Sequence, residues 1–181
     1  MADEKNGNLA AGILAGAIGG LVASWMMNLF SEDAGPKIQQ AVQAIDGNQN
    51  GQGGSQDAED EPKEDATMKA ADAVVSTVTG GRHLSLEERQ KGGSIVHYAF
   101  GAPMGGVYGA LAEYSPTARA GFGTAFAGLL FAGADMIAVP ALHLSPATGD
   151  QPASSLGTPF GAHMVYGVTT ECVRRLVRSA I

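Results

Sequence analysis

The sequence predicts an all-helical integral membrane protein whose core is a bundle of four helices. Two observations lead to this fold class: long apolar stretches without charge, and glycines that recur every four residues along them. Glycine weakens a helix in water, so a row of glycines on one helix face is better explained by close contact with a second helix inside lipid. A third observation is that the acidic charge is confined to one insertion, which leaves the rest of the chain almost neutral.

Four membrane spans are expected within a single membrane domain that covers residues 1–181. The first, residues 9–30, is uncharged and 22 residues long, and a bilayer core requires about 20 residues at roughly 1.5 Å each. Residues 121–142 form another clearly apolar span. Residues 94–113 and 157–173 are more polar, and such helices lie in lipid only where neighbouring helices cover their polar groups.

Residues 31–92 form a long extramembrane insertion, which holds twelve of the eighteen acidic residues and six of the eleven basic ones. Its middle, residues 46–63, has few apolar side chains, and we expect it to be disordered. No basic stripe occurs elsewhere, so no nucleic-acid partner is predicted. The partners that this composition favours are the lipid bilayer, further copies of the chain, or another membrane protein.

Two amphipathic helices are expected in the second half of the insertion. Apolar residues at helical spacing predict a helix over residues 65–79, lying on the membrane surface or on the bundle. The glycine pair at residues 80–81 is expected to end it. Ser85 and Glu88 have the spacing of a capping box, which predicts a short further helix that the glycine pair at residues 92–93 ends.

Basic residues beside the spans predict the orientation of the protein. Arg174, Arg175 and Arg178 follow the fourth span, Arg119 lies between the second and third, and the loop at residues 143–156 has no Lys or Arg. Cytoplasmic flanks of membrane spans carry an excess of these residues. Both termini are therefore expected in the cytoplasm.

Rows of glycine predict where the helices pack against one another. Small residues four positions apart let two backbones approach closely, the arrangement of a glycine zipper. Such a seam lies within the bundle or between copies of the chain, so self-association is also expected. The residues of these rows are Gly12, Gly16, Gly20, Gly101, Gly105, Gly109 and Gly167.

A short internal likeness links the second and fourth spans. Residues 107–113 read VYGALAE and residues 165–171 read VYGVTTE, which share four positions in register. If the likeness reflects a duplication, these two spans are parallel and equivalent members of two hairpins.

Three ionisable residues fall inside the spans at similar depth: His97, Asp135 and His163. A charge at the bilayer centre costs about 3 kcal/mol on insertion scales, so each residue requires a partner, a neutral state or water. Three interpretations fit them: hydrogen bonds that hold helices in register, a proton relay or pH-sensitive gate, and a divalent metal site. No HExxH or CxxC pattern supports the metal site, so neither a metal nor a cofactor is predicted.

Two carboxylates, Glu113 and Glu171, end the second and fourth spans at the opposite, cytoplasmic face. A carboxylate at a membrane interface can reach water, and Glu171 has Arg174 and Arg175 within one helical turn. We therefore expect both carboxylates to be solvated.

Signatures of catalysis are absent from the sequence, which contains neither a GxSxG motif nor a phosphate-binding glycine loop after a strand. We accordingly expect no catalytic residues and no enzymatic activity. The sequence favours a non-enzymatic accessory or scaffold component of a membrane assembly. Two alternatives remain open: a small proton-coupled transporter or ion-permeation protein that uses the intramembrane His and Asp residues, and a metal-binding membrane enzyme.

Three runs of the sequence resemble the YagU-like family of bacterial inner-membrane proteins: ATMKAADAVVSTVTGGRHLSLEERQKGGSIVHYAFGAPMGGVYGALAE, ADMIAVPALHLSP and AHMVYGVTTECVRR. The resemblance covers roughly residues 9–178 and is weakest over residues 46–63. It implies a multi-span protein of the bacterial inner membrane, with no assigned activity. The positions that match the family pattern are His97 with Gly101, Asp135 with Pro140, and His163 with Gly167.

Overall fold

The computed structural model describes residues 7–35, 37–38, 40–41, 64–146 and 156–181. Every regular element in these residues is a helix, which confirms the all-helical fold class. The predicted disorder at residues 46–63 lies outside the described residues. The main helices are α1 (Leu9–Asp33), α3 (Ala66–Thr79), α4 (Leu86–Tyr114), α5 (Thr124–Gly133), α6 (Val139–Ala141) and α7 (Gly157–Ala180).

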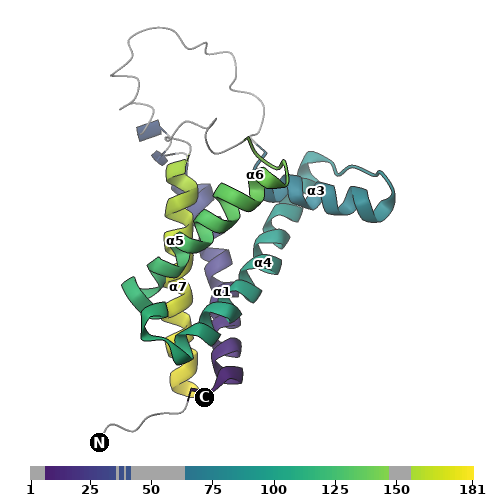
Figure 1. Ribbon diagram of the computed structural model, residues 1–181. Coiled ribbons are helices and arrows are strands. Elements are labelled where there is room, and N and C mark those ends of the chain that lie inside the picture. The colour runs from purple at the N-terminus through teal and green to yellow at the C-terminus, as the bar shows by residue number, and fades with distance from the viewer. Residues whose placement is uncertain (1–6, 36, 39, 42–63, 147–155) are drawn as a thin grey trace, which may run out of the picture.

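Helix α1 lies at the centre of the packing, where it contacts both α4 and α7. A 3₁₀ segment, η1 (Pro116–Gly123), follows α4 and leads into α5, which packs against α7. Figure 1 shows α4 and α7 running in the same direction, toward the end where the C-terminus lies, and α1 running the opposite way. The chain from α5 to α6 then rises obliquely toward α3, which projects to one side.

Two helical runs are long and apolar enough to cross a membrane, by length and composition alone: Leu9–Asp33 and the run Pro116–Ala141. The first contains the predicted span at residues 9–30, and the second covers the predicted span at residues 121–142 except for its last residue. The other two predicted spans lie within α4 and α7, which are helical but do not meet the same criteria. In α7, buried polar groups, among them His163 and Glu171, lower the apolar content.

The interior is made of small residues, and the large aliphatic side chains point outward. Alanines and glycines dominate the buried positions of α1, α4 and α7, and Tyr108 and Tyr166 are the largest fully buried side chains among the described residues. By contrast, Leu129 is 74% exposed. Other outward-facing aliphatic residues are Leu14, Leu21, Ile95, Val107, Leu111, Ile137 and Leu176.

The contact between α1 and α4 depends on glycine. A Cβ atom added to Gly105 would lie 2.7 Å from Cα of Gly20, and one added to Gly16 would lie 2.8 Å from Cα of Gly109. Real Cβ atoms essentially never come closer than 3.0 Å to such an atom. The two glycine rows thus face each other inside one chain, and this contact leaves neither row open to a second copy.

The contact between α5 and α7 repeats one feature of the contact between α1 and α4, a glycine that faces a backbone carbonyl oxygen. In α1, Gly12 faces the carbonyl oxygen of Gly109 on α4, and Gly123 at the start of α5 faces the carbonyl oxygen of Gly167 on α7. Gly109 and Gly167 occupy the same position in the VYGALAE and VYGVTTE likeness. The pairs α1–α4 and α5–α7 therefore share a close-packing point as well as a sequence pattern.

The hairpin formed by α3 and α4 agrees with two predictions made from the sequence and differs from a third. Gly80 ends α3 in the left-handed conformation (φ 73°), and the capping box of Ser85 and Glu88 opens α4. The expected helix end at residues 92–93 is wrong, because α4 continues to Tyr114. A Cβ at Gly92 would lie 2.7 Å from Cβ of Ala71, so this glycine pair serves the approach of α3.

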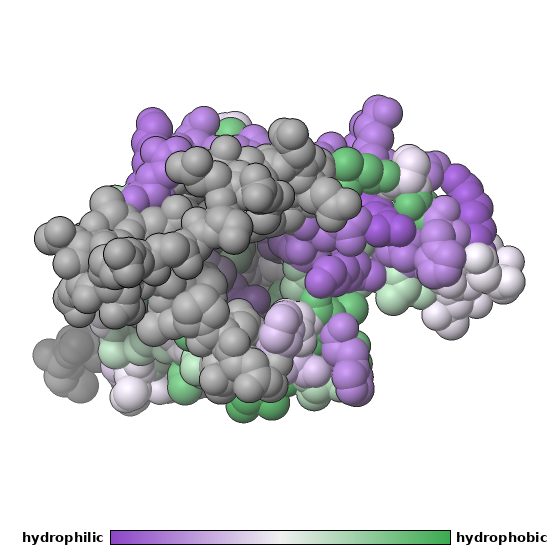
Figure 2. All heavy atoms as spheres, turned by 90° about the horizontal axis from the view of Figure 1, so that it is seen from above, coloured by the Kyte–Doolittle hydropathy of each residue, from purple (hydrophilic) through white to green (hydrophobic). Residues whose placement is uncertain are grey.

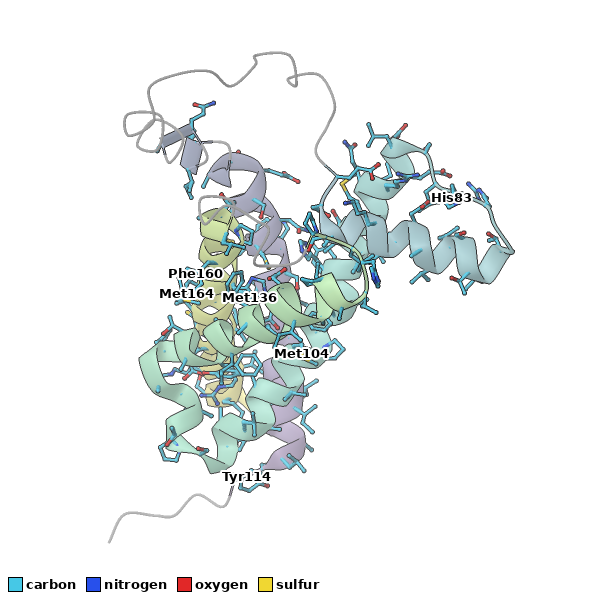
Figure 3. All side chains as sticks on the ribbon, turned by 45° about the horizontal axis from the view of Figure 1, so that its top comes forward. His83, Met104, Tyr114, Met136, Phe160 and Met164 are labelled. Atoms are coloured by element: carbon cyan, nitrogen blue, oxygen red, sulfur yellow. The ribbon has the colours of Figure 1, made fainter. Side chains whose placement is uncertain are left out.

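Helix α3 covers α4 with one half only. Met68 and Ala71 are buried against α4, but Val78, which falls on the predicted apolar face, is 80% exposed. His83, just after α3, lies on this projecting arm, and Tyr114 lies at the opposite end of the molecule (Figure 3). Seen from above, hydrophilic side chains gather over the α3 end (Figure 2).

Candidate functional site

A cavity of about 420 Å³ lies between α4, α7 and the oblique run from α5 to α6, with the first turns of α3 beside it. Its lining is almost entirely apolar. The three ionisable residues singled out in the sequence, His97, Asp135 and His163, all line it, each from a different part of the chain. The fixed rise of a helix places them at one level. The packing of α4 and α7 on α1, and of α5 on α7, brings them to one space.

The closest pair among them is His163 and Asp135. Nε2 of the histidine lies 3.2 Å from Oδ2 of the aspartate, and Nδ1 donates a hydrogen bond of 2.9 Å to the carbonyl oxygen of Pro159. A carbonyl oxygen only accepts, so Nδ1 carries a hydrogen and Nε2 is the nitrogen that faces Asp135. Within the described residues, no hydrogen bond satisfies Oδ2 of Asp135.

A matching arrangement holds His97 on α4. Its Nδ1 atom contacts the side-chain oxygen of Asn28 on α1, which accepts the ring N–H. Its carbonyl oxygen accepts a hydrogen bond of 3.1 Å from Ser24 Oγ. In His97 too, Nδ1 is thus the donor nitrogen, and α1 fixes the ring through a side-chain amide.

Irregular backbone surrounds Asp135. Residues Ala134–Ala138 form a π-helical turn, η2, in which the N–H of Val139 donates to the carbonyl oxygen of Ala134. Pro140 follows directly and has no N–H of its own, so the regular hydrogen-bond pattern cannot continue through it. Single π turns inside α-helices often occur at functional sites.

A second, polar cavity adjoins the first. It measures about 320 Å³, and its lining includes Glu32, Asp65 and Asn28. His97 and Thr67 line both cavities, so they form the boundary between the polar space and the apolar one. Among the residues that the structure describes, no lysine or arginine lines either cavity.

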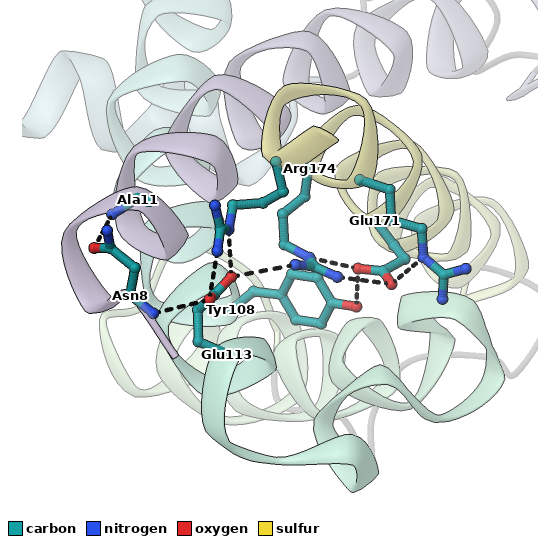
Figure 4. Close-up of polar contacts among 8 residues, drawn as sticks. Asn8, Ala11, Tyr108, Glu113, Glu171 and Arg174 are labelled. Atoms are coloured by element: carbon teal, nitrogen blue, oxygen red, sulfur yellow. Dashed lines mark hydrogen bonds and ion pairs between the residues drawn. The ribbon is translucent and has the colours of Figure 1, made fainter. Parts of the chain in front are cut away.

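The opposite end of the molecule holds a buried ion-pair network (Figure 4). Glu171 is fully buried, with Arg174 Nε at 2.7 Å and Arg175 Nε at 2.6 Å from its carboxylate oxygens. Tyr108 donates a hydrogen bond of 2.8 Å to the same carboxylate. The expectation of a solvated Glu171 is therefore wrong, because α4 covers it.

Glu113 belongs to the same network, and its side chain is 7% exposed. Its carboxylate accepts from Arg178 Nε at 2.7 Å and from the backbone N–H of Asn8 at 3.2 Å, and Arg174 lies 3.7 Å away. The expectation of a solvated Glu113 is wrong too. The arginines that follow Glu171 signalled their local pairs, but nothing in the sequence signalled the contact of Arg178 with Glu113 or the role of Tyr108.

The metal interpretation finds no matching geometry. Among the residues that the structure describes, no three His, Cys, Asp or Glu side chains come close enough together to hold a metal ion. His97, Asp135 and His163 share a cavity without converging on one point.

One family model matches this chain, over residues 75–172, and its description is a protein of unknown function, DUF1440. The chain belongs to the DUF1440 family. The DUF1440 match includes the three ionisable cavity residues and both network carboxylates, and it excludes α1 and the three C-terminal arginines. No curated protein and no solved structure matches the chain.

Proposed function

We propose that this DUF1440 chain is a multi-pass membrane protein that passes protons, coupled to a small solute, through the cavity lined by His97, Asp135 and His163. The observation that carries the proposal is the meeting of these residues in one cavity, with His97 at its boundary to a polar cavity. An accessory or scaffold role, which the sequence alone favoured, gives no reason for an ionisable layer around open space. A metal enzyme has no geometric support.

The distribution of side chains supports a lipid environment. A helical assembly with small residues inside and leucine, isoleucine and valine outside exposes its apolar surface to whatever surrounds it. Lipid accepts such a surface, and close packing of small residues then holds the helices together. We take α1, α4, the run Pro116–Ala141 and α7 as four spans, with the polar groups of α4 and α7 covered by their neighbours.

The orientation and location follow from charge and resemblance. Arg174, Arg175 and Arg178 lie at the end that carries both the start of α1 and the end of α7, so this end is assigned to the cytoplasm. The likeness to the YagU-like family supports the bacterial inner membrane. In this orientation both cavities lie toward the outer face, and the ion-pair network closes the cytoplasmic end.

The ring nitrogens of His97 and His163 support a proton path through the cavity. In both histidines Nδ1 is engaged as a donor, which leaves Nε2 to exchange a proton. Protons reach His97 from the polar cavity, and Asp135 beside His163 accepts them further in. Tyr166, whose hydroxyl donates to the carbonyl oxygen of Gly101 at 2.6 Å, lies on the cytoplasmic side of His163 along α7.

Reconstituted protein provides the test. Potassium-loaded liposomes with valinomycin impose an inward driving force on protons, and an enclosed pH-sensitive dye reports their entry. We expect proton entry above that of empty liposomes, and a fall to the empty-liposome rate for Asp135→Asn. Glu87→Gln, which removes an exposed carboxylate that is paired with Lys91 and lines neither cavity, is the matched control and is expected to keep the full rate. Proton entry equal to that of empty liposomes would remove the transport proposal and leave the accessory role.

A further inference from the structure

We infer that the solute of this cavity is a lipophilic organic monocation, bound with its charge beside Asp135 and its apolar groups against the walls formed by α4 and α5. The inference deepens the proposed function and rests on it for the assignment of the cavity as a solute site. Three features of the described residues carry it: the sign of the charge, the polarity of the walls, and the unsatisfied carboxylate oxygen.

The charge around both cavities is negative. Asp135 lines the apolar cavity, and Glu32 and Asp65 line the polar one. With the three carboxylates ionised, the two linings stay net negative in every protonation state of His97 and His163, which contribute at most two positive charges. The arginines at the other end of the molecule are paired with Glu113 and Glu171 and line neither cavity. A cation is therefore attracted into this space and an anion is repelled from it.

The walls select an organic cation over an inorganic one. Leu129, Leu130, Phe100 and Val96 line the larger cavity, and its volume of about 420 Å³ falls within the range of ligand pockets, roughly 300–1,000 Å³. An inorganic cation needs several oxygen ligands, and the described residues bring no three His, Cys, Asp or Glu side chains together that could hold one. Phenylalanine and tyrosine rings at the wall also attract an organic cation through their π faces.

The position of the charge is set by Asp135. Its Oδ2 atom is shielded from solvent and lacks a hydrogen bond within the described residues, although His163 Nε2 lies 3.2 Å away. With its hydrogen on Nδ1, a neutral His163 donates nothing to this oxygen. A buried carboxylate oxygen without a hydrogen bond is unfavourable, and a cation in the adjoining cavity relieves this cost. The polar cavity, with Glu32 and Asp65, lies on the route by which a cation reaches Asp135 from outside.

The test uses two probe ions of the same shape and opposite charge, tetraphenylphosphonium and tetraphenylborate. Equilibrium dialysis of the purified full chain in a mild detergent measures their binding, with protein-free micelles as the background. We expect saturable binding of the phosphonium and none of the borate above background. Asp135→Asn is expected to weaken phosphonium binding by about tenfold or more, the size of a lost charge-assisted contact.

A cavity-filling variant tests the site without touching a charge. A Cβ at Gly133 meets nothing within 4 Å, and Gly133 lines the cavity, so Gly133→Leu places apolar atoms in it. Gly128, one and a half turns earlier on α5, is equally open but does not line the cavity, which makes Gly128→Leu the matched control. We expect Gly133→Leu to reduce phosphonium binding at least about tenfold and Gly128→Leu to leave it unchanged.

Each outcome separates this inference from the proposed function. Equal binding of phosphonium and borate, or equal effects of Gly133→Leu and Gly128→Leu, overturns the inference whatever the proton measurements show. Charge-selective binding that depends on Asp135 and Gly133 supports it, even if liposomes show no proton entry and the transport proposal fails. Proton entry without phosphonium binding overturns the monocation and leaves transport standing. Circular dichroism and gel filtration confirm that each variant is folded.

Discussion

The contact between α1 and α4 makes a quantitative prediction for two adjacent glycines. At Gly105 an added Cβ would lie 2.7 Å from Cα of Gly20, about 0.7 Å inside the 3.4 Å at which ordinary contact begins, so α1 and α4 must move apart. At Gly106 the nearest atom, Cγ2 of Ile13, is already at 3.5 Å. Gly105→Ala therefore overpacks a rigid backbone contact, which costs about 1–3 kcal/mol, and Gly106→Ala does not.

Comparison of the two variants isolates this packing cost. Both replace glycine by alanine within the same helix, so the gain in helix propensity, up to about 1 kcal/mol, is common to both and cancels. Reversible unfolding in mixed micelles, driven by increasing SDS and followed by circular dichroism, gives the free energy of unfolding for each. We expect Gly105→Ala to be less stable than Gly106→Ala by about 1–3 kcal/mol. Equal stability, or a more stable Gly105→Ala, would refute the close contact of α1 with α4.

Two further predictions concern charge. Glu171→Gln breaks a buried ion pair and is expected to lower the free energy of unfolding by about 3 kcal/mol, against less than about 1 kcal/mol for the exposed Glu87→Gln; similar losses would contradict the buried network. The hydrogen bond from His83, followed by that from the Leu84 N–H, holds the pKa of Asp72 below its usual 3.8, so its stabilisation is complete above that pH and is lost as the pH falls through the lowered pKa. Hydrogen exchange of the Leu84 amide should lose protection in that acidic range, and Asp72→Asn should abolish the dependence; protection in the wild type that is independent of acid counts against it.

Local features of the chain were predictable because their causes lie within a few residues of one another. The length and lack of charge of residues 9–30 determine α1, and Gly80 determines the end of α3 through a left-handed conformation that glycine readily adopts. The Ser85 and Glu88 pair opens α4 for the same local reason. Gly92 misled the prediction, since its role is to let α3 approach α4, and no local pattern distinguishes that role from a helix end.

Part of the candidate site was predictable from local features of the chain, and part was not. A fixed rise per residue and alternating helix directions were enough to place His97, Asp135 and His163 at one level of the fold. Which of them meet, and around what space, depends on the path of α5 and on the π turn before Pro140.

The sequence by itself determined the helices, the apolar character of two of them, and the level of the ionisable residues, since each of these depends on composition and spacing along one segment. Only the tertiary structure decided what covers each polar group. Glu113 pairs with Arg178, 65 residues later, and its side chain is 7% exposed, while Tyr108 closes over the fully buried Glu171. Both carboxylates were expected in water. Burial is a property of neighbours in space, and helix packing sets those neighbours.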